Sequence, residues 1–192
     1  MQNWIQSYQK LLAHIMPWQQ TQKELYCPFA TGTGIISANM VTIISHSPQQ
    51  TRELGRKLGT LLQPGDLLCL QGDLGAGKTT FTQGLAEGWG SVDPVSSPTF
   101  VMVNLYRAQD GTPLYHMDAY RIESLPEAAQ IGIDDMLAEG ALILEWPERI
   151  EALLPTERIW LTLTHQSETE REIQISANGT RPETLIQGIG KW

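Results

Sequence analysis

Four residues at fixed spacing give this sequence its clearest chemical signal. Gly72, Gly77, Lys78 and Thr79 match the pattern Gly, four residues, Gly-Lys-Ser/Thr. In loops of this pattern successive backbone N–H groups surround phosphate oxygens, the lysine reaches the β- and γ-phosphates, and the hydroxyl binds Mg²⁺. The pattern therefore predicts a P-loop that binds a nucleotide and a metal ion.

The residues on either side of the loop support this prediction. Residues 67–70 form an apolar run typical of a buried strand, and residues 81–87 favour a helix. A strand, loop and helix in this order add the positive end of the helix dipole to the phosphate site. A glycine-rich turn that binds nothing is the alternative, and this context disfavours it. The loop residues that we predict to contact the nucleotide are Asp73, Gly75, Ala76, Gly77, Lys78, Thr79 and Thr80.

Two carboxylates follow apolar runs and are candidates for metal binding and hydrolysis. Asp118 follows residues 114–117, and Glu145 follows residues 141–144. The carboxyl ends of strands form the edge where α/β sites lie, so both acids are expected near the loop. Glu145 could instead be a surface acid or a helix cap, and Asp118 could pair with Arg121.

Four other side chains leave their roles open. His116 could act as a base, although a hydrogen-bonded place on the face of a strand is the simpler interpretation. Ser97 and Thr99 could sense a γ-phosphate, or could belong to a turn containing proline. Trp146 could cover the site or simply pack against the core.

Composition indicates a soluble globular chain with an N-terminal addition. The 192 residues are 41% hydrophobic and carry a net charge of −8 with a pI of about 4.9. Such an acidic chain is a poor stand-alone binder of nucleic acid. No apolar run reaches transmembrane length, no secretory signal pattern occurs, and two distant cysteines indicate no disulfide framework, so we predict a cytoplasmic protein.

Hydrophobic periodicity predicts an α/β chain in which strands and helices surround the P-loop, with an antiparallel hairpin that departs from strict alternation of strand and helix. We predict an extension over residues 1–39, poorly ordered or partly helical around residues 4–15, and a P-loop domain over residues 40–192. The predicted strands are 40–45, 67–70, 99–106, 114–118, 141–144, 158–164 and 172–176. The predicted helices are 48–62, 81–87, 126–130, 134–138 and 182–187, with a short one after Pro147.

Four sequence blocks resemble a known family. They are Gly72-Asp-Leu-Gly-Ala-Gly-Lys-Thr-Thr-Phe81, Val95-Ser-Ser-Pro-Thr-Phe100, His116-Met-Asp-Ala-Tyr-Arg121 and Glu145-Trp-Pro-Glu148. Together and in this order they closely resemble the TsaE (YjeE) family, the bacterial ATPases of tRNA threonylcarbamoyladenosine biosynthesis. The resemblance covers roughly residues 40–176, and residues 1–39 have no recognised counterpart.

The resemblance implies a P-loop NTPase-like, three-layer α/β fold with a mixed, mostly parallel central sheet and antiparallel hairpins, which makes residues 40–192 a P-loop ATPase domain. It also implies an ATPase that uses Mg²⁺, works with the TsaB and TsaD proteins, and meets tRNA only indirectly, with no membrane. It implies that Thr79 and Glu145 hold the metal, that Asp118 is needed for activity, and that Thr51 lies near the nucleotide. The resemblance also implies that Arg171 matches an arginine in the last hairpin of the family. With Lys78, the acids Asp118 and Glu145 are the predicted catalytic residues.

Other functions have weaker support. A small P-loop kinase would need a lid with several arginines, but the eight arginines of this chain do not cluster. A GTPase would need an Asn-Lys-x-Asp motif, and no Asn-Lys pair occurs. A nucleotide-binding scaffold with incidental hydrolysis remains the non-enzymatic alternative. Arg121 and Arg149 are candidates for an arginine finger.

Overall fold

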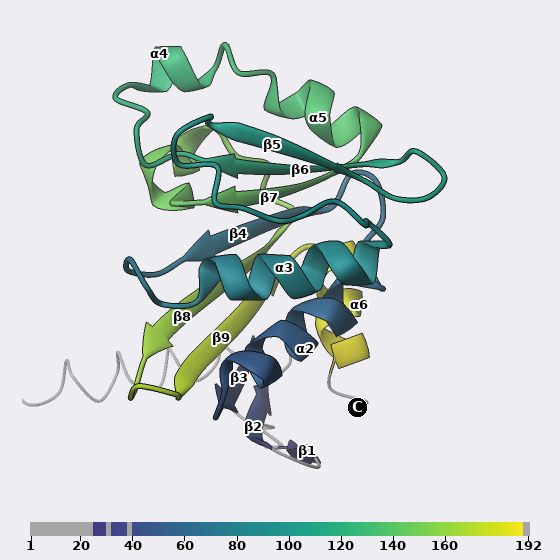
Figure 1. Cartoon of the computed structure of the whole chain (residues 1–192), viewed down its shortest axis with the longest axis vertical. Coiled ribbons are helices and arrows are strands. Elements are labelled where there is room, and N and C mark those ends of the chain that lie inside the picture. Colours follow the sequence, from purple (N-terminus) through teal and green to yellow (C-terminus); the bar gives the residue numbers. More distant parts are fainter. Residues whose placement is uncertain (1–24, 30–31, 38–39, 190–192) are drawn as a thin grey trace, which may run out of the picture.

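The computed structural model describes residues 25–29, 32–37 and 40–189, and in them a central sheet is covered by helices on both faces (Figure 1). The strands are β1 (Leu25–Phe29), β2 (Gly32–Ser37), β3 (Met40–Ser45), β4 (Leu67–Gln71), β5 (Val103–Arg107), β6 (Pro113–Asp118), β7 (Ala141–Glu145), β8 (Arg158–His165) and β9 (Arg171–Asn178). The helices are α2 (Pro48–Gly59), α3 (Lys78–Trp89), α4 (Leu125–Ala128), α5 (Ile133–Glu139) and α6 (Thr180–Ile189), with 3₁₀ turns η1 (Pro147–Arg149) and η2 (Glu151–Leu153).

Over the described residues the strand order is β1-β2-β3-β9-β8-β4-β7-β6-β5. The central strands β8, β4, β7 and β6 are parallel, and the pairs toward each edge are antiparallel. The predicted mixed α/β fold is confirmed, including the hairpins β5–β6 and β8–β9. The parallel centre brings the carboxyl ends of β4, β6 and β7 to one edge of the sheet.

Alternation along β4 divides the core between the two faces of the sheet. Leu68 and Leu70 pack with apolar residues of α2, α3 and α6. Leu67 and Cys69 point to the opposite face. They pack with residues of α4 and α5 and with Ile150 and Leu154, which lie on either side of η2. Because successive side chains of a strand point to opposite faces, a continuous apolar run is the pattern expected of a strand buried on both sides.

Helices α2 and α3 contact each other through glycines. A Cβ atom placed on Gly84 would lie 1.8 Å from the carbonyl oxygen of Arg52, and one on Gly88 would lie 2.0 Å from the carbonyl oxygen of Arg56. From the other side, Gly55 would meet the Phe81 carbonyl oxygen at 2.2 Å. The two backbones therefore touch, which fixes α3 and the loop that precedes it.

Local signals at the start of α2 act as expected. The Ser47 side chain accepts a hydrogen bond from the backbone N–H of Gln50, and Pro48 occupies the first turn. The helix ends at Gly59 rather than at residue 62, and Thr60 follows as its C-cap.

The prediction of a strand from residue 99 is wrong for residues 99–102, because β5 begins at Val103. These residues form a turn in which the N–H groups of Val101 and Met102 donate to the Pro98 carbonyl oxygen. Met102 has a φ of +70°, outside the strand region. The turn places Phe100 at the surface, with 85% of its area exposed.

The N-terminal part differs from expectation in one respect. Strands β1 and β2 lie between residues 25 and 37, where we predicted none, and β2 pairs with β3. The helix predicted around residues 4–15 lies outside the described residues, and the division at residue 39 stays a prediction. In the described ranges no helix is long and apolar enough to cross a membrane.

Candidate functional site

The glycine-rich loop, residues 72–79, connects β4 to α3, and the backbone amides around the start of α3 are available. Gly77 precedes the helix with a φ of +107° and no side chain caps the helix start. Among the described residues no acceptor receives a hydrogen bond from the N–H groups of residues 77–80. Unpaired amides at the start of a helix form a ready site for an anion. This arrangement fits phosphate oxygens.

Lys78 extends back across the loop. Its Nζ donates to the carbonyl oxygens of Gly72 at 2.7 Å and Asp73 at 3.1 Å, and the residue is 6% exposed. The same Nζ lies 4.6 Å from the ring centroid of Trp146. Trp146 has a φ of +57°, uncommon for a residue other than glycine, and its ring contacts that of Tyr120. A buried ammonium is thus held where a phosphate group on the loop would meet it.

The two predicted acids lie together on the α3 face of the sheet. Asp118 and Glu145 are register partners on the parallel strands β6 and β7, and each is 3% exposed. By alternation along each strand, Leu114 lies on the same face as Asp118, and Ile143 lies on the same face as Glu145. Leu114 and Ile143 belong to the core cluster that contains Phe81 of α3. The structure therefore brings both acids to the side of the sheet that carries the glycine-rich loop.

Asp118 holds the turn that precedes β5. Its Oδ2 accepts a hydrogen bond from the Thr99 hydroxyl at 2.6 Å, and its Oδ1 accepts one from the Tyr120 N–H at 2.8 Å. The Ser97 hydroxyl lies 2.8 Å from that of Thr99. Arg121 forms no ion pair with Asp118 in the described structure and lies over the Phe100 ring instead. Asp118 therefore joins residues 97–99 to the acid pair.

The donor set near the loop fits Mg²⁺ shared with a phosphate. Among the described residues no group hydrogen-bonds to the Thr79 hydroxyl or to Oε2 of Glu145, so both oxygens are available. Across the same residues no cluster of three or more His, Cys, Asp or Glu could hold a metal ion. Mg²⁺ commonly binds one or two protein oxygens together with waters and substrate phosphates, so Thr79 and Glu145 suit it in that setting.

A small hollow beside the loop contains the remaining predicted contacts. Thr51 lies at the start of α2, and its Oγ1 is 2.8 Å from the Ser45 hydroxyl. Arg171 at the start of β9 donates from Nε to the Ala76 carbonyl oxygen at 3.1 Å. Residues distant in sequence thus surround one side of the loop. The lining residues are Pro48, Thr51, Gly77, Thr80, Thr169 and Arg171.

The remaining loop residues differ in their exposure to solvent. Asp73 and Gly75 are exposed, whereas Ala76 is buried and its N–H donates to the Asp73 carbonyl oxygen at 3.1 Å. Their backbone groups, not the Asp73 carboxylate, shape the loop.

Burial changes the pKa values of two groups in the sheet. It raises the pKa of the Cys69 thiol to about 12, so this thiol stays protonated at neutral pH. Burial also raises the pKa of the Tyr106 phenol, against the lowering effect of its hydrogen bonds with Asn104 and Ser96. The Tyr106 hydroxyl therefore keeps its proton and donates to the Ser96 carbonyl oxygen at 3.0 Å.

The sequence around this site matches a known protein family. Residues 45–173 match the model of a family described as threonylcarbamoyl adenosine biosynthesis protein TsaE. The chain belongs to the TsaE family. The matched range includes Thr51, the glycine-rich loop, Asp118, Glu145 and Arg171. The family takes part in tRNA threonylcarbamoyladenosine biosynthesis.

Individual TsaE relatives are similar over most of their length. The TsaE protein of Bacillus subtilis is 42% identical over 147 residues, which cover 76% of this chain and 90% of the relative. The TsaE protein of Streptomyces coelicolor is 40% identical over 142 residues, 73% of this chain and 91% of the relative. A crystal structure of YdiB from B. subtilis superposes with a TM-score of 0.68 at 36% identity, covering 79% of this chain and 95% of that one.

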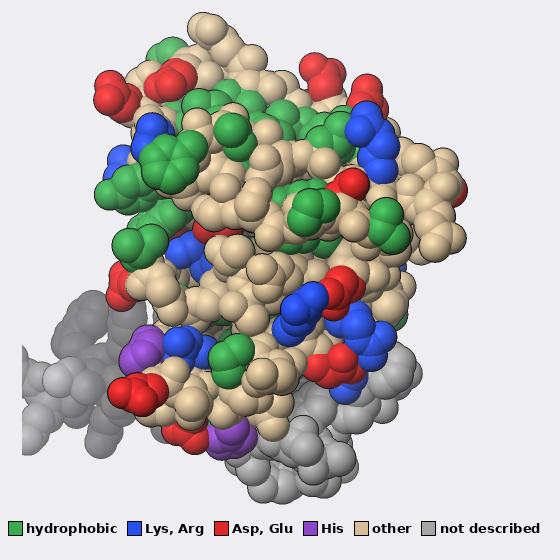
Figure 2. Space-filling model, viewed as in Figure 1, with side chains coloured by type: hydrophobic (Ala, Val, Ile, Leu, Met, Phe, Trp, Pro, Cys, Tyr) green, Lys and Arg blue, Asp and Glu red, His purple; other side chains and the backbone are tan. Residues whose placement is uncertain are grey.

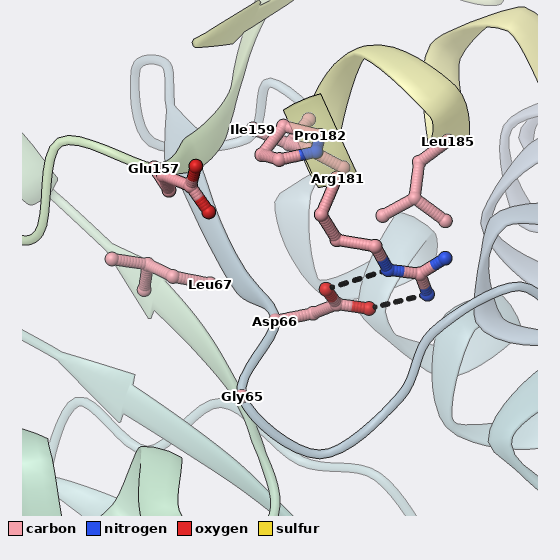
Figure 3. A pocket seen from close by; sticks show the side chains of 8 residues that line it. All are labelled: Gly65, Asp66, Leu67, Glu157, Ile159, Arg181, Pro182 and Leu185. Atoms are coloured by element: carbon pink, nitrogen blue, oxygen red, sulfur yellow. Dashed lines mark hydrogen bonds and ion pairs between the residues drawn. The ribbon is translucent and has the colours of Figure 1, made fainter. Parts of the chain in front are cut away.

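A second hollow lies at the other end of β4 and has a different character. The guanidinium of Arg181 donates to both carboxylate oxygens of Asp66, at 3.2 and 2.9 Å, as Figure 3 shows. Arg181 also donates to the Leu61 carbonyl oxygen at 2.7 Å. These contacts fasten α6 to the turn before β4. We interpret this hollow as structural and distinct from the candidate site.

Two features of this TsaE site are not evident from the sequence. His116, a strand residue whose role the sequence leaves open, contacts Glu145 directly. Tyr106, to which the sequence assigns no role, lies next to His116 in space. The available signal was the alternation of His116 and Asp118 on one strand, which places both on the face of the acids.

Proposed function

We propose that this chain is an Mg²⁺-dependent subunit that binds and hydrolyses ATP in the machinery that makes threonylcarbamoyladenosine beside the anticodon of tRNAs. The observation that carries the proposal is the convergence at one sheet edge of unpaired loop amides, a buried lysine and two buried acids. The names of the TsaE relatives supply the pathway. A reaction that transfers a phosphoryl group to water requires these kinds of groups.

Each residue has a defined part in this proposal. The amides of residues 77–80 and Lys78 bind the β- and γ-phosphates, and Thr51 and Arg171 line the side where the rest of the nucleotide lies. Thr79 and Glu145 hold Mg²⁺ directly or through water. When bound, the ion neutralises charge on the phosphates. Asp118, with Thr99 in contact, orients the attacking water.

Partners are part of the proposal. We propose that the chain acts with TsaB and TsaD in the cytoplasm and that tRNA reaches it only through them, because its net charge is −8. The surface near the carboxyl ends of β6 and β7 carries hydrophobic and basic side chains (Figure 2). Among the exposed residues, Phe100 lies under Arg121, and Tyr120 contacts Trp146, which directly follows β7. An exposed apolar patch of this kind suits a protein contact.

Nucleotide binding tests the first part of the proposal. Titration calorimetry with ATP and Mg²⁺ should show one site in the unaltered chain. Lys78→Ala removes a charge-assisted hydrogen bond and should weaken binding about 10- to 150-fold, equivalent to roughly 1.5–3 kcal/mol. No binding by the unaltered chain would contradict the proposal.

Hydrolysis tests the second part. Phosphate release should be slow for the chain alone and faster when TsaB and TsaD are added. Equal rates in both cases would refute the role of these partners. If tRNA modification survived complete loss of hydrolysis, the chain would be a nucleotide-binding scaffold instead of an ATPase. Transfer of labelled phosphate from ATP to a small acceptor would indicate a kinase.

A further inference from the structure

One side chain controls the direction of the Glu145 carboxylate. His116 Nε2 lies 2.9 Å from Glu145 Oε1, and the two side chains are 0% and 4% exposed. A carboxylate only accepts hydrogen bonds from an imidazole, so Nε2 carries the proton and donates it. Across the described residues no other group binds this carboxylate, and Oε2 stays available.

The sheet holds this pair in place. His116 is the register partner of Ile143, two residues before Glu145, on the adjacent parallel strand. Both side chains therefore lie on the same face as neighbours along a diagonal. The Glu145 backbone is also fixed, because its carbonyl oxygen accepts a hydrogen bond from the Ala119 N–H at 3.0 Å. Rotation of the Glu145 side chain is then the main freedom left to the carboxylate.

A second side chain lies against the imidazole ring. The Tyr106 hydroxyl is 3.4 Å from His116 Nδ1, and because its one proton is donated to the Ser96 carbonyl oxygen it packs beside the ring without donating to it. The two ring centroids are 6.1 Å apart. The ring thus lies between Glu145 and the serine-rich segment that Asp118 holds through Thr99. Residues that bind the far side of a metal ligand commonly set its orientation.

We propose that His116 is a positioning residue for the metal site: through Nε2 it orients Glu145 so that Oε2 is presented to Mg²⁺ bound with the nucleotide. This inference rests on the proposed function. It assigns His116 no contact with nucleotide or metal and no proton transfer. Its effect is on how tightly the nucleotide-bound chain holds the ion.

Two substitutions separate this role from simple packing. The amide nitrogen of glutamine approximates the place of Nε2, so His116→Gln keeps a donor for Glu145. The shorter asparagine approximates the place of Nδ1, so His116→Asn keeps a polar contact toward Tyr106 and loses the donor for Glu145. Tyr115→Phe is the control, because Tyr115 is next to His116 on the opposite face and bonds Glu139.

Mn²⁺ affinity is measured on the chain with ADP bound, from the electron paramagnetic resonance signal of the Mn²⁺ that stays free. ADP affinity without metal and thermal unfolding are measured on the same variants. We expect His116→Asn to weaken Mn²⁺ binding about 10- to 100-fold, as loss of a metal ligand's supporting contact does. His116→Gln should restore most of this affinity, and Tyr115→Phe should match the unaltered chain. ADP affinity without metal should be equal in all four.

Each other result has a definite meaning. Equal Mn²⁺ affinities in both His116 variants and the unaltered chain would overturn the positioning role, as would equal losses in both variants, which packing alone would cause. If the unaltered chain binds no nucleotide, or if nucleotide does not create Mn²⁺ binding, the proposed function fails first and the inference fails with it.

Discussion

The contact between α2 and α3 allows a sharp test of how the fold supports the site. In Gly84→Ala the new methyl group would lie 1.8 Å from the Arg52 carbonyl oxygen, about half of the 3.4 Å at which ordinary contact begins. The obstacle is backbone and cannot rotate away. Overpacking of this kind costs about 1–3 kcal/mol and occasionally more. For a chain of this size that predicts a melting temperature lower by roughly 2–12 °C than that of a variant with alanine at a helix position where the methyl group fits.

The matched control is Gly188→Ala, also inside a helix. Its methyl group would meet the Leu61 Cδ1 atom at 3.1 Å, the far end of a flexible side chain. Alanine favours helix over glycine by about 1 kcal/mol, so this variant should be neutral or stabilised. Thermal unfolding followed by circular dichroism compares the two. Equal melting temperatures for Gly84→Ala and Gly188→Ala would refute the packing argument.

Three further predictions concern single side chains. Glu145→Gln keeps an acceptor for His116 but removes the charge. ATP affinity without metal should stay unchanged, while calorimetry should show that the increase in ATP affinity caused by Mg²⁺ is reduced more than about tenfold. An undiminished increase would exclude Glu145 as a metal ligand. Arg181→Ala removes the ion-pair partner of the Asp66 carboxylate, which is 7% exposed and keeps, among the described residues, only the hydrogen bond from the Gln63 N–H. This should cost about 1–3 kcal/mol in urea unfolding, with ATP affinity unaltered because the pair lies at the far end of β4. Cys69, with its pKa raised by burial from 9.0 to about 12, should resist thiol labelling at pH 8 in a Cys27→Ser chain until urea unfolds it. Since the folded pKa is the higher one, the stability due to this thiol is complete below pH 9 and declines as the pH rises toward 12, and rapid native labelling would contradict its burial.

Local patterns explain why much of the fold could be predicted from the sequence. The apolar run of β4 and the glycine spacing after it specify a strand, a loop and a helix within a few residues of one another. The start of α2 follows from Ser47 and Pro48 in the same way. Alternation in β8 and β9 predicted their hairpin. Each of these signals acts over one turn or one pair of strands.

Features that depend on contacts between distant segments could not be predicted in this way. Nothing around Gly55 or Gly84 indicates that two helix backbones touch there, because glycine inside a helix usually only weakens it. The turn at residues 99–102 consists of residues that favour strands, but the Thr99 contact with Asp118 holds it. Here a tertiary hydrogen bond prevails over local preference.

The same distinction applies to the site. Asp118 and Glu145 could be predicted as a pair because each ends a strand, and parallel strands bring their ends together. Their partners could not, since pairing of His116 with Glu145 depends on which strands are adjacent. Knowledge that β6 lies beside β7 would have sufficed, because the register then places the histidine diagonal to the acid.

The arginines bear on how fast this chain could act alone. Arg121 lies over the Phe100 ring at 4.9 Å and Arg149 over the Tyr120 ring at 5.2 Å, so both finger candidates are engaged with surface aromatics. Arg171 donates to the carbonyl oxygens of Ala76 in the glycine-rich loop and of Ser167 in the turn between β8 and β9. An arginine that reaches the γ-phosphate accelerates hydrolysis about 10³–10⁵-fold in P-loop enzymes. If one of these stacked arginines, or one from a partner, moves to the loop only on assembly, slow turnover alone and faster turnover in the complex follow from the same geometry.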